Sequence, residues 1–93
     1  MDGKHPHPHQ DTQKILHRIA RAAGHLQAIG QMVEDGRDCA DVLIQLAAVR
    51  SAVNNIGKLL IHDHMAHCIA DAVEHGDQEA LQSFADAMDQ YLK

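Results

Sequence analysis

The segment from Cys39 to His75 contains no proline and carries a continuous apolar seam, and this feature most constrains the fold. Apolar residues recur in it at intervals of three and four, which predicts one long helix. The seam consists of Val42, Leu43, Leu46, Val49, Val53, Ile56 and Leu60, with Met65 as a further candidate. We expect Asp38 to cap this helix, Cys39 to be its first residue, and Gly57 to be the site of any kink.

Two shorter helices are predicted on either side of the long one. The first starts with Asp11 or Thr12 as its N-cap and ends at Asp35, with Gly36 in a left-handed conformation. Its apolar stripe consists of Ile15, Ile19, Ala22, Leu26, Ile29 and Val33. Asp77 is predicted to cap the last helix. The buried face of that helix is expected to contain Leu81, Phe84, Ala85, Met88 and Leu92.

Three helices of such unequal length do not make a balanced bundle, and 93 residues form only one small domain. The long seam must therefore be buried by a second copy of the same helix. We predict an all-α, three-helix protomer with a long second helix, which forms an antiparallel dimer. Residues 11–93 are the expected domain. Residues 1–10, in which Pro6 and Pro8 alternate with histidines, are expected to form a flexible, extended arm.

The composition limits the compartment and the partners. The chain has two cysteines and no apolar run long enough to span a membrane, and we expect no signal peptide. We therefore expect a cytoplasmic protein without a membrane partner, whose thiols are ligands or redox groups. The net charge is −5, but basic residues slightly outnumber acidic ones in residues 1–58, whereas acidic residues dominate 59–93. This distribution leaves room for a basic face in the first half.

A cysteine and a histidine with helical spacing suggest a metal site near the end of the long helix. His64 and Cys68 are four residues apart, so both point to one face of a helix. Cys39 is the natural third ligand, but a straight helix separates it from His64 by roughly 37 Å. A site that uses all three residues must therefore be built from two chains. Nine histidines in the sequence also suggest metal handling.

The donor set indicates which metals fit. Two thiolates and one imidazole form a soft set that suits Cu(I). A histidine from the arm would give two nitrogens and two sulfurs, a set that suits Ni(II) or Zn(II).

Four segments of the chain resemble the copper-sensitive operon repressor (CsoR) family, which also includes nickel/cobalt, formaldehyde and persulfide sensors. They are Arg18–Leu26, Glu34–Cys39, Leu46–Ala52 and His64–Cys68. The resemblance covers nearly all of residues 12–93. It implies helical dimers that pair into tetramers, bind operator DNA without ligand, and release it on sensing.

The resemblance also implies roles for individual residues. Cys39, His64 and Cys68 match the positions that bind Cu(I) in the copper members, and His7 lies where nickel and cobalt members place an extra histidine. Arg18, Arg21 and Arg50 match basic positions that are implicated in DNA contact in the family. Lys14 and Lys58 are further candidates for DNA contact. Two features depart from the copper members. Asp38 replaces a tyrosine before the first cysteine, and the region of Ser83 and Phe84 has no glutamate.

We therefore expect a metal-responsive repressor whose partner is operator DNA and whose effector is Cu(I), because His64–Cys68 resembles the copper members. A nickel, cobalt or zinc sensor that uses His7 is the alternative. A persulfide sensor would use Cys39 and Cys68 as a redox pair, and a metal-storage protein would need the ligands without the arginines. The sequence shows no general base or substrate pocket, so we expect neither enzyme activity nor a small-molecule substrate.

Overall fold

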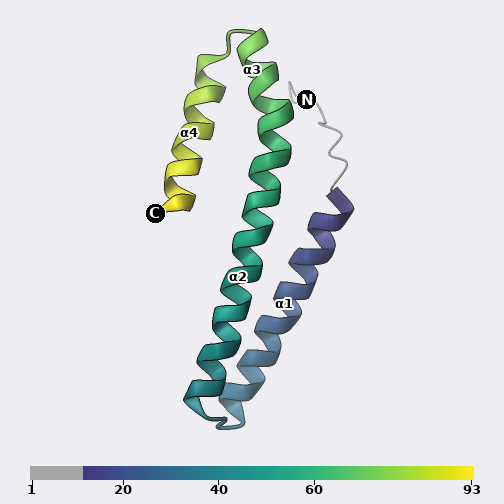
Figure 1. Cartoon of the computed structure of the whole chain (residues 1–93), viewed down its shortest axis with the longest axis vertical. Coiled ribbons are helices and arrows are strands. Elements are labelled where there is room, and N and C mark those ends of the chain that lie inside the picture. Colours follow the sequence, from purple (N-terminus) through teal and green to yellow (C-terminus); the bar gives the residue numbers. More distant parts are fainter. Residues whose placement is uncertain (1–11) are drawn as a thin grey trace. The chain divides into compact units, whose positions relative to one another are not determined.

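The computed structural model describes residues 12–93, except for the side chains of residues 64–66. Every regular element in this range is helical, which confirms the predicted all-α class. The elements are α1 (Thr12–Glu34), α2 (Cys39–His64), a π-helix η1 (Met65–Ile69), α3 (Ala70–Glu74) and α4 (Gln78–Leu92) (Figure 1). The predicted arm, residues 1–10, lies outside the described residues. The described chain forms two compact units, residues 12–61 and residues 62–93.

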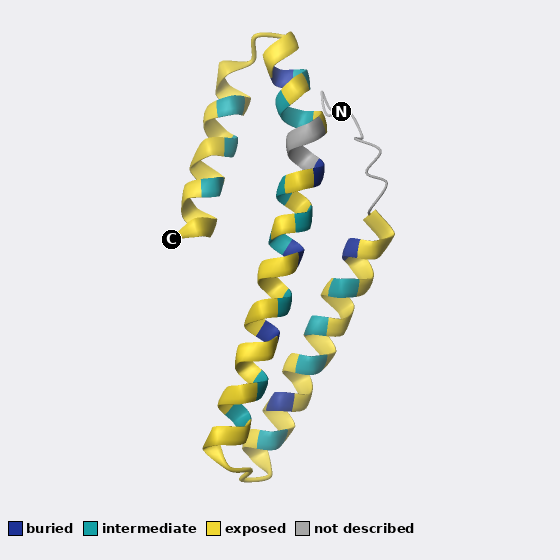
Figure 2. Ribbon diagram, viewed as in Figure 1, coloured by how far each residue is buried: buried dark blue, intermediate teal, exposed yellow. Residues whose placement is uncertain are grey.

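In the first unit, α1 packs against the part of α2 that precedes residue 62. Ile15 and Ile29 of α1 and Val49 and Ile56 of α2 are buried (Figure 2). These residues belong to the predicted stripes, so the spacing identified the contact faces correctly.

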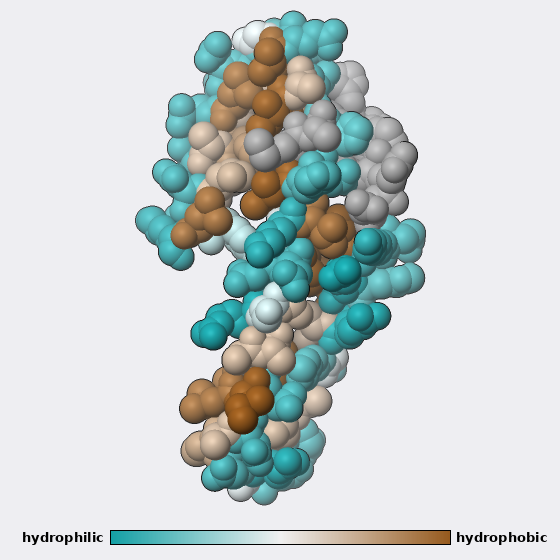
Figure 3. Space-filling model, in the orientation of Figure 1, coloured by the Kyte–Doolittle hydropathy of each residue, from teal (hydrophilic) through white to brown (hydrophobic). Residues whose placement is uncertain are grey.

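Much of both stripes nevertheless remains uncovered in this unit. Ile19 and Leu26, which lie between the two buried isoleucines of α1, are 45% and 51% exposed. The other exposed large apolar residues of the unit are Leu16, Val33, Leu43, Ile44, Leu46, Val53 and Leu60. Apolar groups accordingly interrupt the polar surface in Figure 3. A groove of about 330 Å³ runs between α1 and α2 and is lined by Ile19, Ala22, Ala23, Leu26, Val49, Val53 and Ile56.

The turn between α1 and α2 closes as the sequence predicts. Gly36 has a φ of +72°, and its N–H donates to the carbonyl of Val33 at 3.1 Å. The N–H of Arg37 donates to the carbonyl of Met32 at 2.9 Å. These two bonds form a Schellman motif, which satisfies carbonyls that the end of α1 leaves without a helical partner.

The Gly36→Ala variant is expected to lower the free energy of unfolding by about 1–2 kcal/mol, because a Cβ disfavours the left-handed conformation. No heavy atom lies within 4 Å of the added Cβ, so the cost arises from the backbone alone. Urea denaturation followed by circular dichroism measures the change. Gly24→Ala is the control. This glycine lies inside α1 with equally open space, so alanine should stabilise the protein by roughly 0.5–1 kcal/mol. Equal effects of the two substitutions would contradict the prediction.

The second unit contains the end of the long helical run and α4. Gly76 has a φ of +65°, and the N–H of Asp77 donates to the carbonyl of Ala72 at 2.8 Å. The Asp77 side chain accepts a hydrogen bond from the N–H of Ala80 at 3.0 Å, which confirms it as the N-cap of α4. Leu81, Phe84 and Met88 of α4 are half-buried. The expected burial of Ala85 and Leu92 is wrong, since both are exposed in this unit.

The helical run from Cys39 does not continue as a uniform α-helix to His75. It changes to a π-helix at Met65–Ile69 and returns to α-geometry in α3, so the irregularity lies beyond the glycine at which we expected a kink. A π-turn accommodates one extra residue and is frequent at functional sites. Within the described residues, no helix is long and apolar enough to cross a membrane.

Candidate metal and nucleic-acid sites

Cys39 is the first residue of α2, as predicted, and it is exposed as a reduced thiol. The carbonyl of Asp38 accepts a hydrogen bond from the N–H of Val42 at 3.1 Å, which closes the first turn of the helix. The exposed Sγ of Cys39 is therefore accessible to a metal ion at the start of α2.

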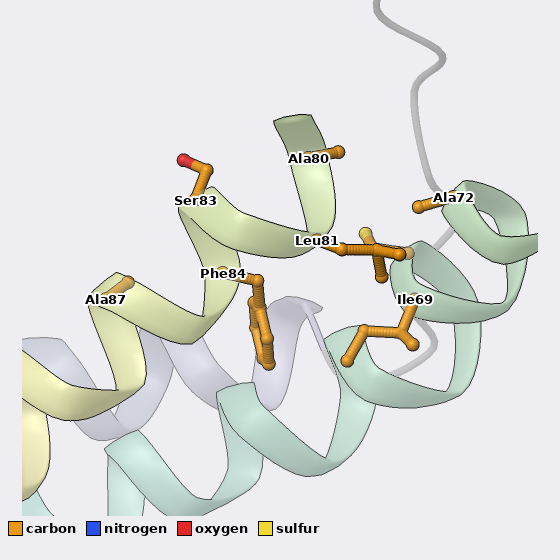
Figure 4. A pocket seen from close by; sticks show the side chains of 8 residues that line it. Ile69, Ala72, Ala80, Leu81, Ser83, Phe84 and Ala87 are labelled. Carbon is orange, nitrogen blue, oxygen red and sulfur yellow. The ribbon is translucent and has the colours of Figure 1, made fainter. Parts of the chain in front are cut away.

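Cys68 lies in the π-helix and has a different environment. Its half-buried thiol lines a cavity of about 370 Å³. Ile69 and Ala72 form one side of this cavity, and the other side is formed by α4 through Ala80, Leu81, Ser83, Phe84 and Ala87. Figure 4 shows Leu81 and Phe84 reaching from α4 toward the helix that carries Ile69. Among the described residues that line this cavity, all except Cys68 and Ser83 are apolar.

Burial and nearby carboxylates both disfavour the charged form of this thiol. The pKa of Cys68 is raised from its ordinary value, first by desolvation and then by the negative charges of Asp71 and Asp63. Asp63 is itself buried, and its Oδ1 lies 3.9 Å from Nε2 of His67, which is exposed. Sequence reasoning missed Asp63. The available signal was its spacing, three residues after Leu60 of the apolar seam.

In the metal-free protein, Cys68 is expected to react with iodoacetamide more slowly than Cys39, because its thiol is less exposed and its pKa is raised. The Asp71→Asn variant removes one negative charge, so the pKa of Cys68 should fall and its thiolate fraction should rise. We expect its alkylation at neutral pH to accelerate roughly two- to fivefold, the effect of a partly screened charge. Mass spectrometry of the two cysteine peptides gives both rates. Cys39 is the internal control, and an unchanged rate at Cys68 would contradict the prediction.

The remaining ligand candidates are located only in part. His64 is the last residue of α2, but its side chain lies outside the described part of the structure, as does the whole of His7. By these helix bounds, Cys39 and His64 occupy opposite ends of α2, and Cys68 follows within the next turn.

A further group of donor atoms lies at the end of α3. Asp71, Glu74 and His75 place one donor atom each within 4.8 Å of the others. The Nδ1–H of His75 donates to the carbonyl of Asp71 at 2.9 Å, and Nδ1 is 3.4 Å from the Asp71 carboxylate. The hydrogen bond to the backbone and then the carboxylate raise the pKa of His75. A cationic His75 suits a helix C-terminus, so this group acts as a cap.

Two arginines of α1 line a second cavity. Arg18, Arg21 and His25 enclose about 150 Å³ together with Ala52 and Asn55 of α2, and Ala22 completes the lining. Arg50 is exposed and lies outside this cavity, as do the exposed Lys14 and Lys58. Sequence reasoning proposed the two arginines but missed His25 and Asn55. His25 follows Arg18 by seven residues, which puts both on one face of α1.

Comparison with known proteins gives consistent matches along nearly the whole chain. Residues 11–90 match the family described as metal-sensitive transcriptional repressor. The copper-sensing transcriptional repressor CsoR of Bacillus subtilis is 37% identical over 85 residues, which cover 90% of this chain and 84% of that protein.

Two solved structures are similar in fold. The Cu(I)-containing CsoR of Geobacillus thermodenitrificans matches with a TM-score of 0.85 and 32% identity, covering 97% of this chain and 95% of that one. The nickel-responsive transcriptional regulator InrS matches with a TM-score of 0.73 and 36% identity, covering 94% and 99% respectively.

Proposed function

Because this chain belongs to the family of metal-sensitive transcriptional repressors, we propose that it binds operator DNA in its metal-free form and releases the DNA when Cu(I) binds to Cys39, His64 and Cys68. Its relatives are repressors rather than enzymes. The observation that carries the choice of site is the position of the two thiols, one at the start of α2 and one in the turn after its end.

The chemistry of these residues fits Cu(I). Two thiolates and an imidazole are soft donors, which Cu(I) prefers over carboxylates and water. Apolar side chains of α4 line the cavity beside Cys68, and such a setting suits a monovalent ion that needs few ligands. When bound, Cu(I) would displace the thiol protons and neutralise one of the two thiolate charges.

We propose that the metal site joins two chains. A straight α2 places its two ends roughly 37 Å apart, so one protomer cannot bring Cys39 to His64 and Cys68 along this helix. An antiparallel dimer would pair Cys39 of one copy with His64 and Cys68 of the other. The uncovered apolar groove between α1 and α2 supports such an assembly. In this proposal residues 11–93 act as one domain, and dimers pair into tetramers.

We further propose that Arg18, Arg21 and Arg50, assisted by Lys14 and Lys58, contact operator phosphates. Arginine binds phosphate through two parallel N–H bonds, and such contacts position a protein on DNA without reading its sequence. The chain carries a net charge of −5, so basic surfaces from several subunits have to act together.

The metal ligands and these arginines are different side chains, so metal and DNA do not compete for the same groups. Release must then be allosteric, with the metal favouring an assembly that fits DNA poorly. By linkage, DNA weakens metal binding by the same factor as metal weakens DNA binding. His64 is the proposed lever, because one ring nitrogen can bind the metal while the other contacts a neighbouring helix.

A nickel sensor is the second candidate, and the similarity to the nickel-responsive InrS favours it. His7 would then add a nitrogen donor and give the set of two nitrogens and two sulfurs that suits Ni(II). The position of His7 lies outside the described residues, so this candidate is supported by sequence and by relatives.

The test begins with an operator that the metal-free protein selects from random duplex DNA. The affinity for this operator is then measured anaerobically by fluorescence anisotropy without metal and with saturating Cu(I), Ni(II) or Zn(II). We expect Cu(I) to weaken binding roughly 5- to 150-fold, the usual range of allosteric coupling. Release by Ni(II) alone would favour the nickel sensor. Metal binding without selection of any operator would indicate a storage protein instead.

A further inference from the structure

The cavity that contains Arg18 and Arg21 is built from both helices of the first unit. Arg18, Arg21 and His25 are spaced by three and four residues on α1, and Asn55 faces them from α2. Ala22 and Ala52 leave the space between them open. A volume of about 150 Å³ is several times the share of one water molecule in the liquid, about 30 Å³, so it can hold a tetrahedral group of five heavy atoms.

The acidic residues of the described segment 12–61 lie away from the positive charge of this cavity. Among the residues that the structure describes, no carboxylate forms an ion pair with Arg18 or Arg21. The acidic residues of segment 12–61 are confined to 34–41, around the turn between α1 and α2. Two guanidinium groups in a concave site therefore concentrate positive potential, which attracts anions.

A hydrogen bond between the helices fixes one wall of the cavity. The Nε2–H of His25 donates to Oε1 of Gln45 on α2 at 2.7 Å, and both side chains are half-buried. The imidazole is thus held in place before any ligand binds, and preorganised groups lose little entropy on binding. Asn55 adds an amide that can donate two hydrogen bonds.

We propose that this cavity is a discrete binding site for one tetrahedral oxyanion, and that in the repressor complex the oxyanion is a single backbone phosphate of the operator. Arg18 and Arg21 supply charge and paired donors, and Asn55 donates from the opposite helix. The inference deepens the proposed repressor function and rests on it. It differs from a diffuse basic surface, because a discrete site depends on Asn55 and on the space beside Ala52.

The first experiment uses inorganic phosphate as the probe and needs no DNA. Phosphate is titrated into the isotope-labelled, metal-free protein at constant ionic strength, and the side-chain amide and guanidinium N–H signals are followed by NMR. We expect saturable shifts at Asn55, Arg18 and Arg21 but not at Asn54, the neighbouring residue outside the lining. Equal, non-saturating shifts at Asn54 and Asn55 would overturn the proposal.

The second experiment compares two variants with the same change in charge. Asn55→Asp puts a carboxylate into the cavity, whereas Asn54→Asp puts one on the same exposed stretch of α2 outside it. We expect Asn55→Asp to weaken operator binding about tenfold or more beyond Asn54→Asp, as loss of a charged hydrogen-bonding site does. Equal losses would show diffuse attraction and overturn the proposal. Ala52→Leu, which fills the cavity without a charge change, should reproduce the loss if the variant remains folded by circular dichroism.

The two experiments separate this proposal from the repressor function. In one outcome, the protein binds the operator, phosphate binding is not saturable, and the two aspartate variants have equal effects. This outcome would agree with the repressor function and contradict the discrete site. In another outcome, phosphate binding is saturable but the protein selects no operator. This outcome would support the oxyanion site with a free anion as its ligand, and it would contradict the repressor function. A neutral methylphosphonate at one operator linkage should abolish the difference between the two variants, which identifies the DNA phosphate as the occupant.

Discussion

The Cys39→Ala variant and the His64→Ala/Cys68→Ala double variant are each expected to lose high-affinity Cu(I) binding, and a mixture of the two is expected to recover it. In the proposed antiparallel dimer, the mixed dimer keeps one intact site, formed by Cys39 of one subunit and His64 and Cys68 of the other. Loss of a direct ligand should cost more than the roughly 10- to 100-fold that removal of an outer partner costs. Anaerobic competition with a chromophoric Cu(I) chelator measures both results.

Subunits must be exchanged by co-expression or joint refolding before the mixture is measured. His62→Ala is the control, since His62 is an exposed histidine near the end of α2 that we do not propose as a ligand. Its affinity should remain close to that of the unaltered protein. Recovery of no sites in the mixture, or full Cu(I) binding by a stable monomer, would exclude a site shared between chains.

The Arg18→Ala/Arg21→Ala/Arg50→Ala variant is expected to lose operator binding while it keeps Cu(I) binding. An arginine that binds a phosphate displaces counterions from the DNA, so the slope of log affinity against log salt should decrease by about one for each phosphate that is no longer bound. Because the chain is acidic overall, little nonspecific attraction remains to compensate for the loss. Anisotropy titrations at several salt concentrations give the affinity and the slope together.

Arg37→Ala provides a matched control for the loss of an arginine. Arg37 is exposed, lies between α1 and α2, and is 3.9 Å from the Asp41 carboxylate. Its replacement should leave the salt slope unchanged. Unchanged operator affinity in the triple variant would remove the proposed DNA surface and favour a storage role.

The helix boundaries could be predicted from sequence because local chemistry determines them. The left-handed glycine after α1 and the aspartate cap of α4 act through hydrogen bonds to residues three to five positions away. Burial could be predicted only in part. Ile15 and Ile29 are buried within one chain, whereas Ile19 and Leu26 share their stripe and remain exposed. A periodic pattern shows that a face is apolar, but it does not show which molecule covers it.

The candidate metal and DNA sites could likewise be predicted only in part from the sequence. The position of Cys39 at a helix start could be predicted from Asp38, a residue type that favours N-caps, and the structure confirms that position. The apolar wall beside Cys68 depends on how α4 packs, and the cavity near Asn55 depends on which faces of α1 and α2 meet. Such packing between distant residues leaves no periodic signal in one sequence. The roles of Cys39, His64, Cys68 and His7 as metal ligands remain predictions.

At the π-turn Met65–Ile69, a change in the number of residues should disturb the structure more than a substitution does. A π-turn holds one residue more than an α-turn, so deletion of one residue would let the segment become regular α-helix. The helix after the turn would keep its phase with α2, because the π-turn and the α-turn each complete one revolution. A deletion between His64 and Cys68 would instead shorten their spacing from four residues to three. Among natural variants of this chain, substitutions in the turn should therefore be far commoner than insertions or deletions.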